Sequence, residues 1–513
     1  MLKHFLKRLY ALALVIMLLP LSCSGKPDAD LKNSTFKKLS SMRTAKKETV
    51  ISHLERLFKK ASRAGEDKIV VDYFFRHRSS DKSLISANPL YSADETSLEY
   101  YYVKELHEFY DILFIDSSGF IFSTIRKEAD YRKNIFEGDL AKSRISTLLK
   151  SDPYVRFVDY DYYAPSKEAA SFIINPVKEK GELAGWIAFQ YSINTINALL
   201  TDVITTGELG NTGEIYLVNE ENLMLSQSRF FPTNTIMNFN VDTESLKKAI
   251  GKNEGEIISE DYRGVRVFSS FEKFSFMGNN WIIVSEVDED EVITKHFREN
   301  MEYFINRMYK KLSIGYDDGS GIKEITENLI KVDINEYASG KKGEALSTLG
   351  ISTCTGLVIS YPGRFTYLGH IYPLDSTFFS SFERSAINIL YKARGELFGD
   401  GTNDLLGNMF REIREFKIYP YEKRELKAVI VAVHTDNLKT IIERLLDFGF
   451  MLSQITIVYS SDMDYANIYT RVGDDSISIA WINEQSQGKI YTNPANNKNL
   501  GEIFKEISGY SLN

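Results

Sequence analysis

Hydrophobic and polar residues alternate with a helical period along the first part of the chain. Apolar residues recur there at helical spacing, with lysine and glutamate residues between them: Val50, Ile51, Leu54, Leu57 and Phe58. Such spacing gathers the apolar side chains on one face of a helix. The pattern predicts one long amphipathic helix over about residues 31–64 and a second helical stretch before Tyr110.

Two later segments, residues 112–123 and 214–226, share a different pattern. Each consists of a β-rich run, a tight turn containing Asp or Asn, and a second run that ends in serine. This pattern is typical of a β-hairpin. Further strand-like runs follow the two hairpins, at residues 170–176, 185–191, 256–259, 265–271 and 280–286. The sequence therefore predicts two antiparallel sheets in tandem, an internal repeat of a whole domain.

The chain stays strongly charged after the second predicted sheet. Residues 295–311 are rich in Lys, Arg and Glu, which predicts an amphipathic helix that cannot span a bilayer. A turn-rich linker follows at residues 313–321, and a third domain is predicted over residues 322–513. A length of 513 residues fits two to four domains, because a single hydrophobic core rarely grows that large.

The first residues have the pattern of an export signal. Lys3, Lys7 and Arg8 precede an apolar run that ends at Leu19 and is too short to span a membrane comfortably. Ser22-Cys23 then resembles the cleavage and acylation site of bacterial lipoproteins. We therefore predict a signal peptide over residues 1–22 and a lipid-anchored tether over residues 23–30. An ordinary secretory signal or an uncleaved anchor is the alternative.

This leader predicts an exported protein, held by lipid in the cell membrane or the outer membrane and facing the periplasm or the exterior. The formal net charge of −8 argues against a nucleic-acid partner. We find no phosphate-binding glycine loop, no dinucleotide fingerprint and no zinc-ligand spacing, so no cofactor or metal is predicted. The chain has 2 Cys. If Cys23 is lipidated, Cys354 has no disulfide partner.

The two predicted sheets carry motifs of a known sensor family. The stretch from 116 to 134, together with residues 163–166, 172–177, 210–218 and 261–264, resembles the double Cache sensor domain of bacterial chemoreceptors. The resemblance covers about residues 31–293. It implies two stacked lobes of PAS-like topology: a membrane-distal lobe over residues 31–200 and a membrane-proximal lobe over residues 201–312. It also implies a small ligand, such as an amino acid or another metabolite, bound in the distal lobe.

A candidate ligand site follows from polar residues of the distal lobe. Five of them are expected on strands and loops that face one sheet: Arg126, Tyr131, Asp161, Tyr163 and Ser171. Charge-assisted hydrogen bonds from Arg126 would suit a ligand carboxylate. The alternative is that Arg126 is a solvated surface residue.

The third domain contains the second cysteine beside a predicted hairpin. A loop of residues 361–363 would place Cys354 directly opposite His370, whereas a two-residue loop would separate their faces. A thiol becomes a nucleophile when an adjacent imidazole takes its proton, and Thr348 is a candidate to orient that imidazole. His434 is a rival base. The alternative is that Cys354 is a buried small apolar residue.

The same residues resemble a second family. Thr348 stands six residues before Cys354, and His370 follows the hairpin and precedes Pro373 by three residues. With a strand at 426–433, a helix at 437–448 and strands at 455–459 and 477–481, the pattern is similar to the CheD-type chemoreceptor glutamine deamidases. The resemblance implies hydrolysis of glutamine side-chain amides, with Cys354 as nucleophile, His370 as base and Thr348 as orienting group.

The fold class predicted as a whole is multidomain α+β. It consists of a long N-terminal helix, two PAS-like antiparallel-sheet lobes and a C-terminal α/β sandwich of CheD-like type. The predicted function is an extracytoplasmic lipoprotein that senses a small molecule and couples it to a Cys–His amidohydrolase. Its substrate would be an exported protein or a small molecule. One alternative is a non-catalytic binding protein that signals through a membrane partner, and another is an adhesion or scaffold lipoprotein.

The anchoring hypothesis leads to a direct prediction. Cys23→Ala should move the protein from the membrane fraction to the soluble exported fraction, because acylation contributes most of the membrane affinity of a lipoprotein. Cell fractionation followed by immunoblotting measures this change. A variant that stays in the membrane fraction with its signal segment intact would show an uncleaved anchor instead.

Overall fold

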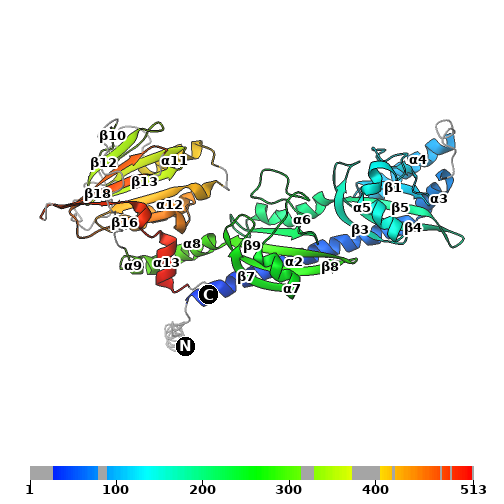
Figure 1. The fold of residues 1–513 in the computed structure, drawn as a ribbon, viewed down its shortest axis with the longest axis horizontal. Coiled ribbons are helices and arrows are strands. Elements are labelled where there is room, and N and C mark those ends of the chain that lie inside the picture. The colour runs from blue at the N-terminus through cyan, green and yellow to red at the C-terminus, as the bar shows by residue number, and fades with distance from the viewer. Residues whose placement is uncertain are drawn as a thin grey trace, which may run out of the picture.

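The computed structural model describes residues 27–78, 89–312, 329–372, 405–418, 422–473, 476–485 and 488–510. The predicted signal peptide, Cys23 and the linker at 313–321 lie outside these residues. Figure 1 shows an elongated molecule in which three α/β bodies follow one another in a row. We call them the first lobe (β1–β5), the second lobe (β6–β9) and the C-terminal domain (β10–β19).

One long helix connects the first two bodies. Helix α2 (Pro27–Glu66) runs along the second lobe and reaches the first, so that both lobes pack against a common spine (Figure 1). Most of its buried residues are apolar and lie on one face, among them Leu39, Val50, Leu54, Leu57 and Ala61. The helix predicted over residues 31–64 is therefore confirmed. Asp67 begins helix α3 (Lys68–His77) by accepting a hydrogen bond from the backbone N–H of Ile69.

The first lobe is a five-stranded antiparallel sheet in the order β2-β1-β5-β4-β3. Helices α4 (Pro89–Tyr101) and η2 (Tyr102–Leu106) precede it. Helices η3 (Gly138–Lys142) and α5 (Arg144–Ser151) lie on the face opposite to α2. The strands are β1 (Asp111–Asp116), β2 (Ile121–Thr124), β3 (Phe157–Tyr163), β4 (Glu168–Glu179) and β5 (Glu182–Ser192).

The second lobe repeats this plan with four antiparallel strands in the order β6-β9-β8-β7. Helix α6 (Ile193–Thr206) leads into it, and α7 (Glu244–Lys252) packs on its sheet. The second arm of its predicted hairpin is reduced to a single bridge between Val218 and Met224. The strands are β6 (Glu214–Val218), β7 (Glu254–Glu260), β8 (Arg266–Phe276) and β9 (Asn279–Asp288).

Strand β9 continues directly into helices α8 (Glu289–Glu299) and α9 (Met301–Met308). Both carry apolar residues on one side and charged residues on the other, as the sequence predicted for this region. Among the described residues, no helix has the length and apolar character needed to cross a bilayer. The segment after the second lobe instead packs on the C-terminal domain.

The C-terminal domain contains two five-stranded sheets, β10-β12-β17-β18-β19 and β11-β14-β13-β15-β16. Strands β15 and β16, and the short β10 with β12, pair in parallel, and the other pairs are antiparallel. The first sheet comprises β10 (Leu329–Lys331), β12 (Ala345–Ile351), β17 (Tyr465–Arg471), β18 (Ile477–Asn483) and β19 (Gly488–Thr492). The second comprises β11 (Glu336–Ser339), β14 (Phe365–Ile371), β13 (Thr355–Tyr361), β15 (Lys427–Ala432) and β16 (Ile455–Tyr459).

The two sheets enclose one core, and helices cover the outer face of the second sheet. Alternate residues of β13 point to opposite faces of the second sheet. Val358 packs in the core between the two sheets, and Leu357 and Ile359 pack against the helices. The helical elements are α11 (Leu405–Glu415), η4 (Lys423–Glu425), α12 (Leu438–Phe448), η5 (Leu452–Gln454), η6 (Pro494–Asn496) and α13 (Leu500–Ser508). The α+β class, the long N-terminal helix and the antiparallel sheets are therefore confirmed, whereas the domain boundaries stay predictions.

A buried arginine fastens the spine helix to the second lobe. Arg43 is 5% exposed and donates hydrogen bonds to Ser270 Oγ (2.8 Å) and to the carbonyl oxygen of Phe271 (2.9 Å). Its guanidinium also lies 3.2 Å from the Glu272 carboxylate. Arg56, on the same helix, pairs with Glu108 at the surface, where its own side chain is 49% exposed.

These two arginines should differ sharply in their contribution to stability. Arg43→Ala should lower the free energy of unfolding by about 3 kcal/mol, since it leaves buried acceptors without a donor. Arg56→Ala is the matched control on the same helix and should cost less than about 1 kcal/mol. Urea unfolding followed by circular dichroism compares the two. Equal losses would show that Arg43 does not join the helix to the lobe.

Candidate functional site

The first lobe has a polar cluster on the sheet face that is turned away from α2. Asp111 begins β1 and pairs in register with Gln190 on β5, and both residues are buried. Asp111 Oδ1 accepts backbone hydrogen bonds from Ile112 (2.7 Å), Ile125 (2.8 Å) and Arg126 (3.1 Å). Its Oδ2, like both polar atoms of the Gln190 amide, has no hydrogen-bond partner among the described residues.

A second buried acid belongs to the same cluster. Asp130 Oδ2 accepts a hydrogen bond from the Tyr163 hydroxyl at 2.8 Å, and Asp130 Oδ1 has no partner in the described part of the chain. Burial raises the pKa of Asp111 to about 7, against the opposing effect of its backbone hydrogen bonds. Burial also raises the pKa of Asp130. Buried acids with unused oxygens are the groups that a cationic or hydrogen-bond-donating ligand would satisfy.

More acidic groups surround this pair. Glu128 accepts a hydrogen bond from the Tyr110 hydroxyl at 2.7 Å. Glu168 Oε1 is buried with no partner among the described residues, and burial raises the pKa of this carboxyl. The excess of carboxyl groups favours a ligand that carries a positive charge. We call Asp111, Asp130, Tyr163 and Gln190 the first-lobe site.

The five residues proposed from the sequence have different locations. Tyr163 belongs to the first-lobe site, and Asp161 lies half-buried on the same sheet face, accepting a hydrogen bond from the Tyr162 N–H. Tyr131 is half-buried beside Arg132. Arg126 is exposed, and its guanidinium lies 3.9 Å from the Tyr110 ring centroid. Arg126 Nε donates to the Tyr110 carbonyl oxygen.

The expectation of a common sheet face is wrong for Ser171. Its strand neighbours Ala170 and Phe172 face the site, so Ser171 points toward α2, where its hydroxyl donates to the Val158 carbonyl oxygen at 2.7 Å. Sequence reasoning also missed Asp111, Asp130 and Gln190. The available signal for Asp111 and Gln190 was a polar residue placed beside or inside an apolar β-rich run.

The C-terminal domain brings two of its three predicted catalytic residues into contact. Thr348 on β12 and His370 on β14 belong to different sheets, and Thr348 Oγ1 lies 2.7 Å from His370 Nδ1. The same hydroxyl donates its proton to the carbonyl oxygen of Val332 at 2.8 Å. It therefore accepts from His370, which places the imidazole proton on Nδ1 and leaves a lone pair on Nε2. Nε2 has no partner in the described ranges.

The hairpin register differs from both loops considered for the sequence. Tyr361 pairs with Phe365, so the loop is residues 362–364, and Gly356 rather than Cys354 lies opposite His370. Cys354 precedes β13 by one residue and belongs to the same inter-sheet core as Val358. A residue two positions from the direct partner lies about 7–8 Å away. Accordingly, no hydrogen bond between Cys354 and His370 occurs in the described structure.

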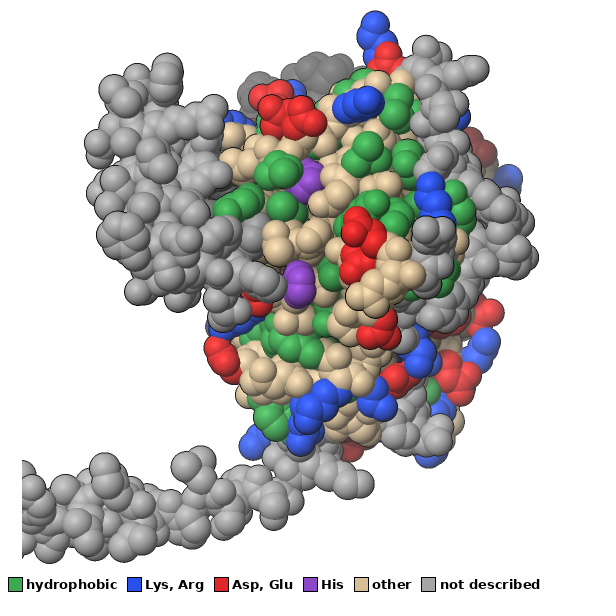
Figure 2. All heavy atoms as spheres, turned by 90° about the vertical axis from the view of Figure 1, so that its left-hand side faces the viewer, with side chains coloured by type: hydrophobic (Ala, Val, Ile, Leu, Met, Phe, Trp, Pro, Cys, Tyr) green, Lys and Arg blue, Asp and Glu red, His purple; other side chains and the backbone are tan. Residues whose placement is uncertain are grey.

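Burial keeps both groups uncharged in this arrangement. It lowers the pKa of His370 to about 4, with a smaller opposing effect of Asp333. It raises the pKa of the Cys354 thiol, with a smaller opposing effect of Thr353. Figure 2 looks onto this end of the molecule, where histidine side chains appear among apolar and uncharged groups. At neutral pH the pair is a thiol and an imidazole, not a thiolate and an imidazolium.

The helices after β9 dock on the C-terminal domain through apolar, polar and charged contacts. The rings of Phe304 on α9 and Phe504 on α13 lie 4.9 Å apart. The Thr294 hydroxyl accepts a hydrogen bond from the Leu452 N–H at 3.0 Å. Lys505 donates to Glu289 at 2.9 Å, and Ser453 donates to Asp290. We call this contact between α8–α9 and the C-terminal domain the junction.

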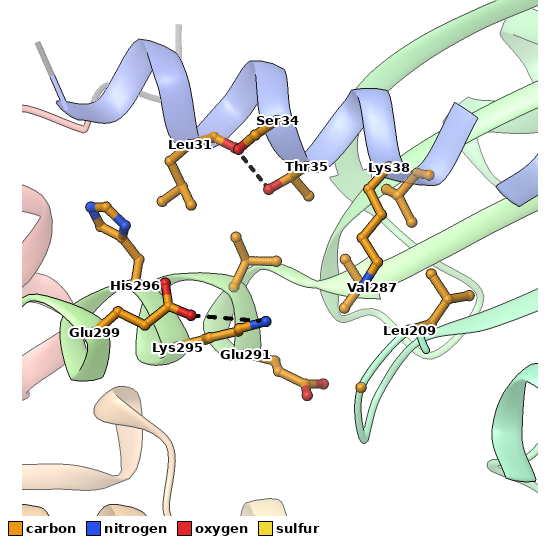
Figure 3. Close-up of a pocket in the computed structure, with 13 residues that line it drawn as sticks. Leu31, Ser34, Thr35, Lys38, Leu209, Val287, Glu291, Lys295, His296 and Glu299 are labelled. Carbon is orange, nitrogen blue, oxygen red and sulfur yellow. Dashed lines mark hydrogen bonds and ion pairs between the residues drawn. The ribbon is translucent and has the colours of Figure 1, made fainter. Parts of the chain in front are cut away.

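A small pocket lies beside the junction, between the first turns of α2 and helix α8. Figure 3 shows Leu31 and Thr35 of α2 on one side and Lys295, His296 and Glu299 of α8 on the other. The cavity measures about 280 Å³. It shows that the start of the spine helix and the helix that leaves the second lobe lie next to each other.

Solved structures of chemoreceptor sensory domains are similar to part of this chain. One is the ligand-binding domain of the Pseudomonas fluorescens chemoreceptor CtaA in complex with L-isoleucine, which is 14% identical. The match covers 54% of this chain and 100% of that chain, with a TM-score of 0.34. Another is the periplasmic sensory domain of the Campylobacter jejuni chemoreceptor Tlp1, which is 12% identical. That match covers 51% of this chain and 98% of the other, with a TM-score of 0.38.

A family assignment rests on the sequence of the two lobes. No curated protein sequence matches the chain. Residues 30–295, more than half of the chain, match the family described as Cache domain. These residues comprise nearly all of the spine helix, the antiparallel sheets of both lobes and the first part of α8. The chain belongs to the Cache domain family.

Proposed function

We propose that this protein is an extracytoplasmic sensor whose first lobe binds a small molecule bearing an ammonium group, such as an amino acid. The observation that carries this proposal is the pair of buried acids, Asp111 and Asp130, each with one oxygen that has no partner among the described residues. A ligand ammonium group donates up to three hydrogen bonds and neutralises the buried charge. Lipid attachment at Cys23 would hold the sensor at a membrane surface.

The rim of the first-lobe site offers a group for the other end of an amino acid. Arg126 stacks on Tyr110, and its backbone N–H donates to Asp111 Oδ1, so its side chain starts beside the buried acids. A guanidinium that turns inward from this position would bind a ligand carboxylate in two-point geometry. The site then holds an acid for the ammonium group and a base for the carboxylate.

Ligand binding would reach the C-terminal domain through one strand and one helix. Trp281 on β9 donates to both oxygens of the Asp159 carboxylate on β3, at 3.1 Å each, and so joins the two lobes. The same strand continues into α8, whose residues Glu289, Asp290 and Thr294 contact the C-terminal domain. A displacement of β9 therefore moves the junction, because a helix and the strand it follows move together.

For the C-terminal domain we propose hydrolysis of glutamine side-chain amides, on an exported protein or a small molecule. His370 Nε2 takes the Cys354 proton, the thiolate attacks the amide carbon, and the imidazolium protonates the departing ammonia. Water then hydrolyses the thioester and releases the acid. The Thr348–His370 hydrogen bond supports this assignment, because it holds the imidazole in the tautomer that a base requires.

A second function is favoured by a different observation. The thiol of Cys354 is buried, its pKa is raised, and it forms no hydrogen bond with His370 among the described residues. On this alternative the C-terminal domain is a scaffold that presents the ligand state of the sensor to a membrane partner. The catalytic proposal requires that Cys354 and His370 approach each other in the active state, whereas the alternative does not.

The first-lobe site should lose affinity when one acid is neutralised. Asp130→Asn should weaken binding of the preferred amino acid by about tenfold or more, since it replaces a charge-assisted hydrogen bond. Isothermal titration calorimetry with a panel of amino acids measures the effect. Ser171→Ala, on the opposite sheet face, is the control and should leave affinity unchanged. Absence of binding by every amino acid, or equal effects of the two variants, would contradict the site.

If the C-terminal domain hydrolyses glutamine side chains, the wild-type protein should release ammonia. Cys354→Ala and His370→Ala should each abolish ammonia release from glutamine-containing exported proteins, and their effects should not add, because the two residues act as one unit. Thr366→Val, elsewhere on the strand of His370, is the control and should retain activity. If the wild type releases no ammonia with the sensor ligand bound, and both variants mainly lower the melting temperature, the domain is a scaffold.

A further inference from the structure

The second lobe contains its own buried acidic pair, separate from both sites described above. Glu214 on β6 pairs in register with Glu286 on β9, and the two residues are only 3% and 2% exposed. Ser269 on β8 pairs with Glu286 from the other side. Tyr216 lies two positions along β6 from Glu214, so all four side chains occupy the sheet face that is turned away from α2.

The two carboxylates differ in how they are satisfied. Glu214 accepts hydrogen bonds from the Tyr262 hydroxyl, from Ser228 Oγ at 3.3 Å and from the Arg229 N–H at 3.3 Å. Neither oxygen of Glu286 has a partner among the described residues. The Tyr216 hydroxyl also lacks a partner there, although the residue is fully buried, and the Ser269 hydroxyl lies close enough to Glu286 to lower the pKa of that carboxyl without a hydrogen bond of ordinary geometry. Native structures rarely leave several neighbouring buried polar groups unsatisfied without a functional reason.

Aromatic rings form one wall of this cluster. The ring of Tyr262 lies 5.6 Å from that of Tyr216, 5.5 Å from that of Phe239 and 5.9 Å from that of Phe231, measured between centroids. Aromatic faces attract organic cations, and this attraction strengthens when water is excluded. Carboxylates beside aromatic rings are a combination that recognises an ammonium group.

The positive charges nearby are already engaged elsewhere. Arg263 forms ion pairs with Asp261 and Asp288 and stacks on Phe230 at 3.6 Å. Arg229 donates to the Gly213 carbonyl oxygen at 2.7 Å. No lysine or arginine of the described residues therefore pairs directly with the carboxyl of Glu214 or Glu286.

A cleft at the junction comes close to this cluster. A cleft of about 800 Å³ separates the second lobe from the C-terminal domain. Phe231 and Arg263, which border the cluster, also line this cleft, together with Met451 and Lys505 of the C-terminal domain. Glu214 and Glu286 do not themselves line the cleft, so a ligand would have to displace bordering side chains to reach them.

We propose that the second lobe holds a second ligand site, for a small organic ammonium ion bound between Glu214, Glu286 and the rings of Tyr216 and Tyr262. An organic cation fits better than a metal ion, because no group of three or more metal-ligating side chains occurs among the described residues. The proposal rests on residues that neither the first-lobe site nor the C-terminal site uses.

Proton linkage gives this site a characteristic pH dependence. Burial raises the pKa of Glu286 to about 8, and Asp261 and Glu214 add to the rise against the opposing effects of the neighbouring Ser269 hydroxyl and of Arg263. Burial likewise raises the pKa of Glu214. Without a cation Glu286 is thus protonated at neutral pH, and binding must expel that proton. Affinity for an ammonium ion should therefore increase as pH rises from about 6 to 8.

The location of the second-lobe site predicts how a bound cation would affect the junction. Glu286 stands two residues before Asp288, where β9 ends and α8 begins. Ionisation of Glu286 around a bound cation would change the end of the strand from which the junction helix starts. A second ligand would therefore act on the C-terminal domain directly, without passing through the first lobe.

Calorimetric titration of the full chain with choline tests the proposal. Choline should bind, and its uncharged isostere 3,3-dimethylbutan-1-ol should bind at least tenfold more weakly. Glu286→Gln should reduce choline affinity at least tenfold without lowering the melting temperature, because glutamine resembles the protonated acid. Glu256→Gln, an exposed carboxylate on the same sheet, is the matched control and should have no effect. Wild-type affinity should be several-fold higher at pH 8 than at pH 6.

Other outcomes would overturn the proposal. Equal binding of choline and its isostere would show that charge is not recognised. Absence of heat with choline, ethanolammonium and tetramethylammonium would show that the site binds no such ion. Loss of choline binding in Asp130→Asn but not in Glu286→Gln would place the cation in the first lobe. If Glu286→Gln fails to fold, Tyr262→Leu serves instead, and unchanged choline affinity in that folded variant would equally refute the site.

Discussion

The structure depends on the continuity of strand β9 with helix α8. The strand is central in the sheet of the second lobe, its Trp281 bonds to Asp159 of the first lobe, and its helix is buried on the C-terminal domain. At the junction, the Asp290 carboxylate and the Thr294 hydroxyl accept backbone hydrogen bonds from the segment 452–453. These polar contacts fix the orientation of α8 on the C-terminal domain. The apolar packing of Phe304 against Phe504 stabilises the same contact. Three bodies are thereby held by one continuous element.

Each body contains buried polar groups that have no hydrogen-bond partner among the described residues. Among them are Asp111 Oδ2 and the Gln190 amide in the first lobe, the Glu286 carboxyl in the second, and His370 Nε2 in the C-terminal domain. Burying such groups costs free energy that folding alone does not recover. They lie on the sheet faces or in the inter-sheet core, where strand register fixes their positions. A ligand or substrate that supplies the missing partner gains the hydrogen bond without a large cost of ordering the protein, which is the physical basis of preorganised binding.

Much of the fold could be predicted from periodicity, because α2 and the long strands have strongly patterned faces. The hairpin at residues 362–364 could not, since a loop one residue longer or shorter fits the same turn residues while shifting the register. Ser171 was assigned to the wrong face because the bulge between Val158 and Asp161 changes the alternation of the neighbouring strand. A single polar residue within an apolar run, such as Gln190, signals only that a polar group is buried, and tertiary packing is needed to show that it lacks a partner among the described residues. The Thr348–His370 bond joins two sheets, and no local pattern encodes such a contact.

Hydrogen exchange at the junction tests the central claim most directly, namely that ligand binding in the Cache lobes changes the contact of α8 with the C-terminal domain. The backbone amides of Leu452 and Ser453 donate to side chains of α8 and report on that contact alone. Mass spectrometry of the full chain, with and without an amino acid shown to bind, measures their exchange rates. We expect the rates of peptides spanning residues 289–299 and 450–456 to change together on binding. Unchanged rates in both peptides, with protection confined to the first lobe, would contradict the account.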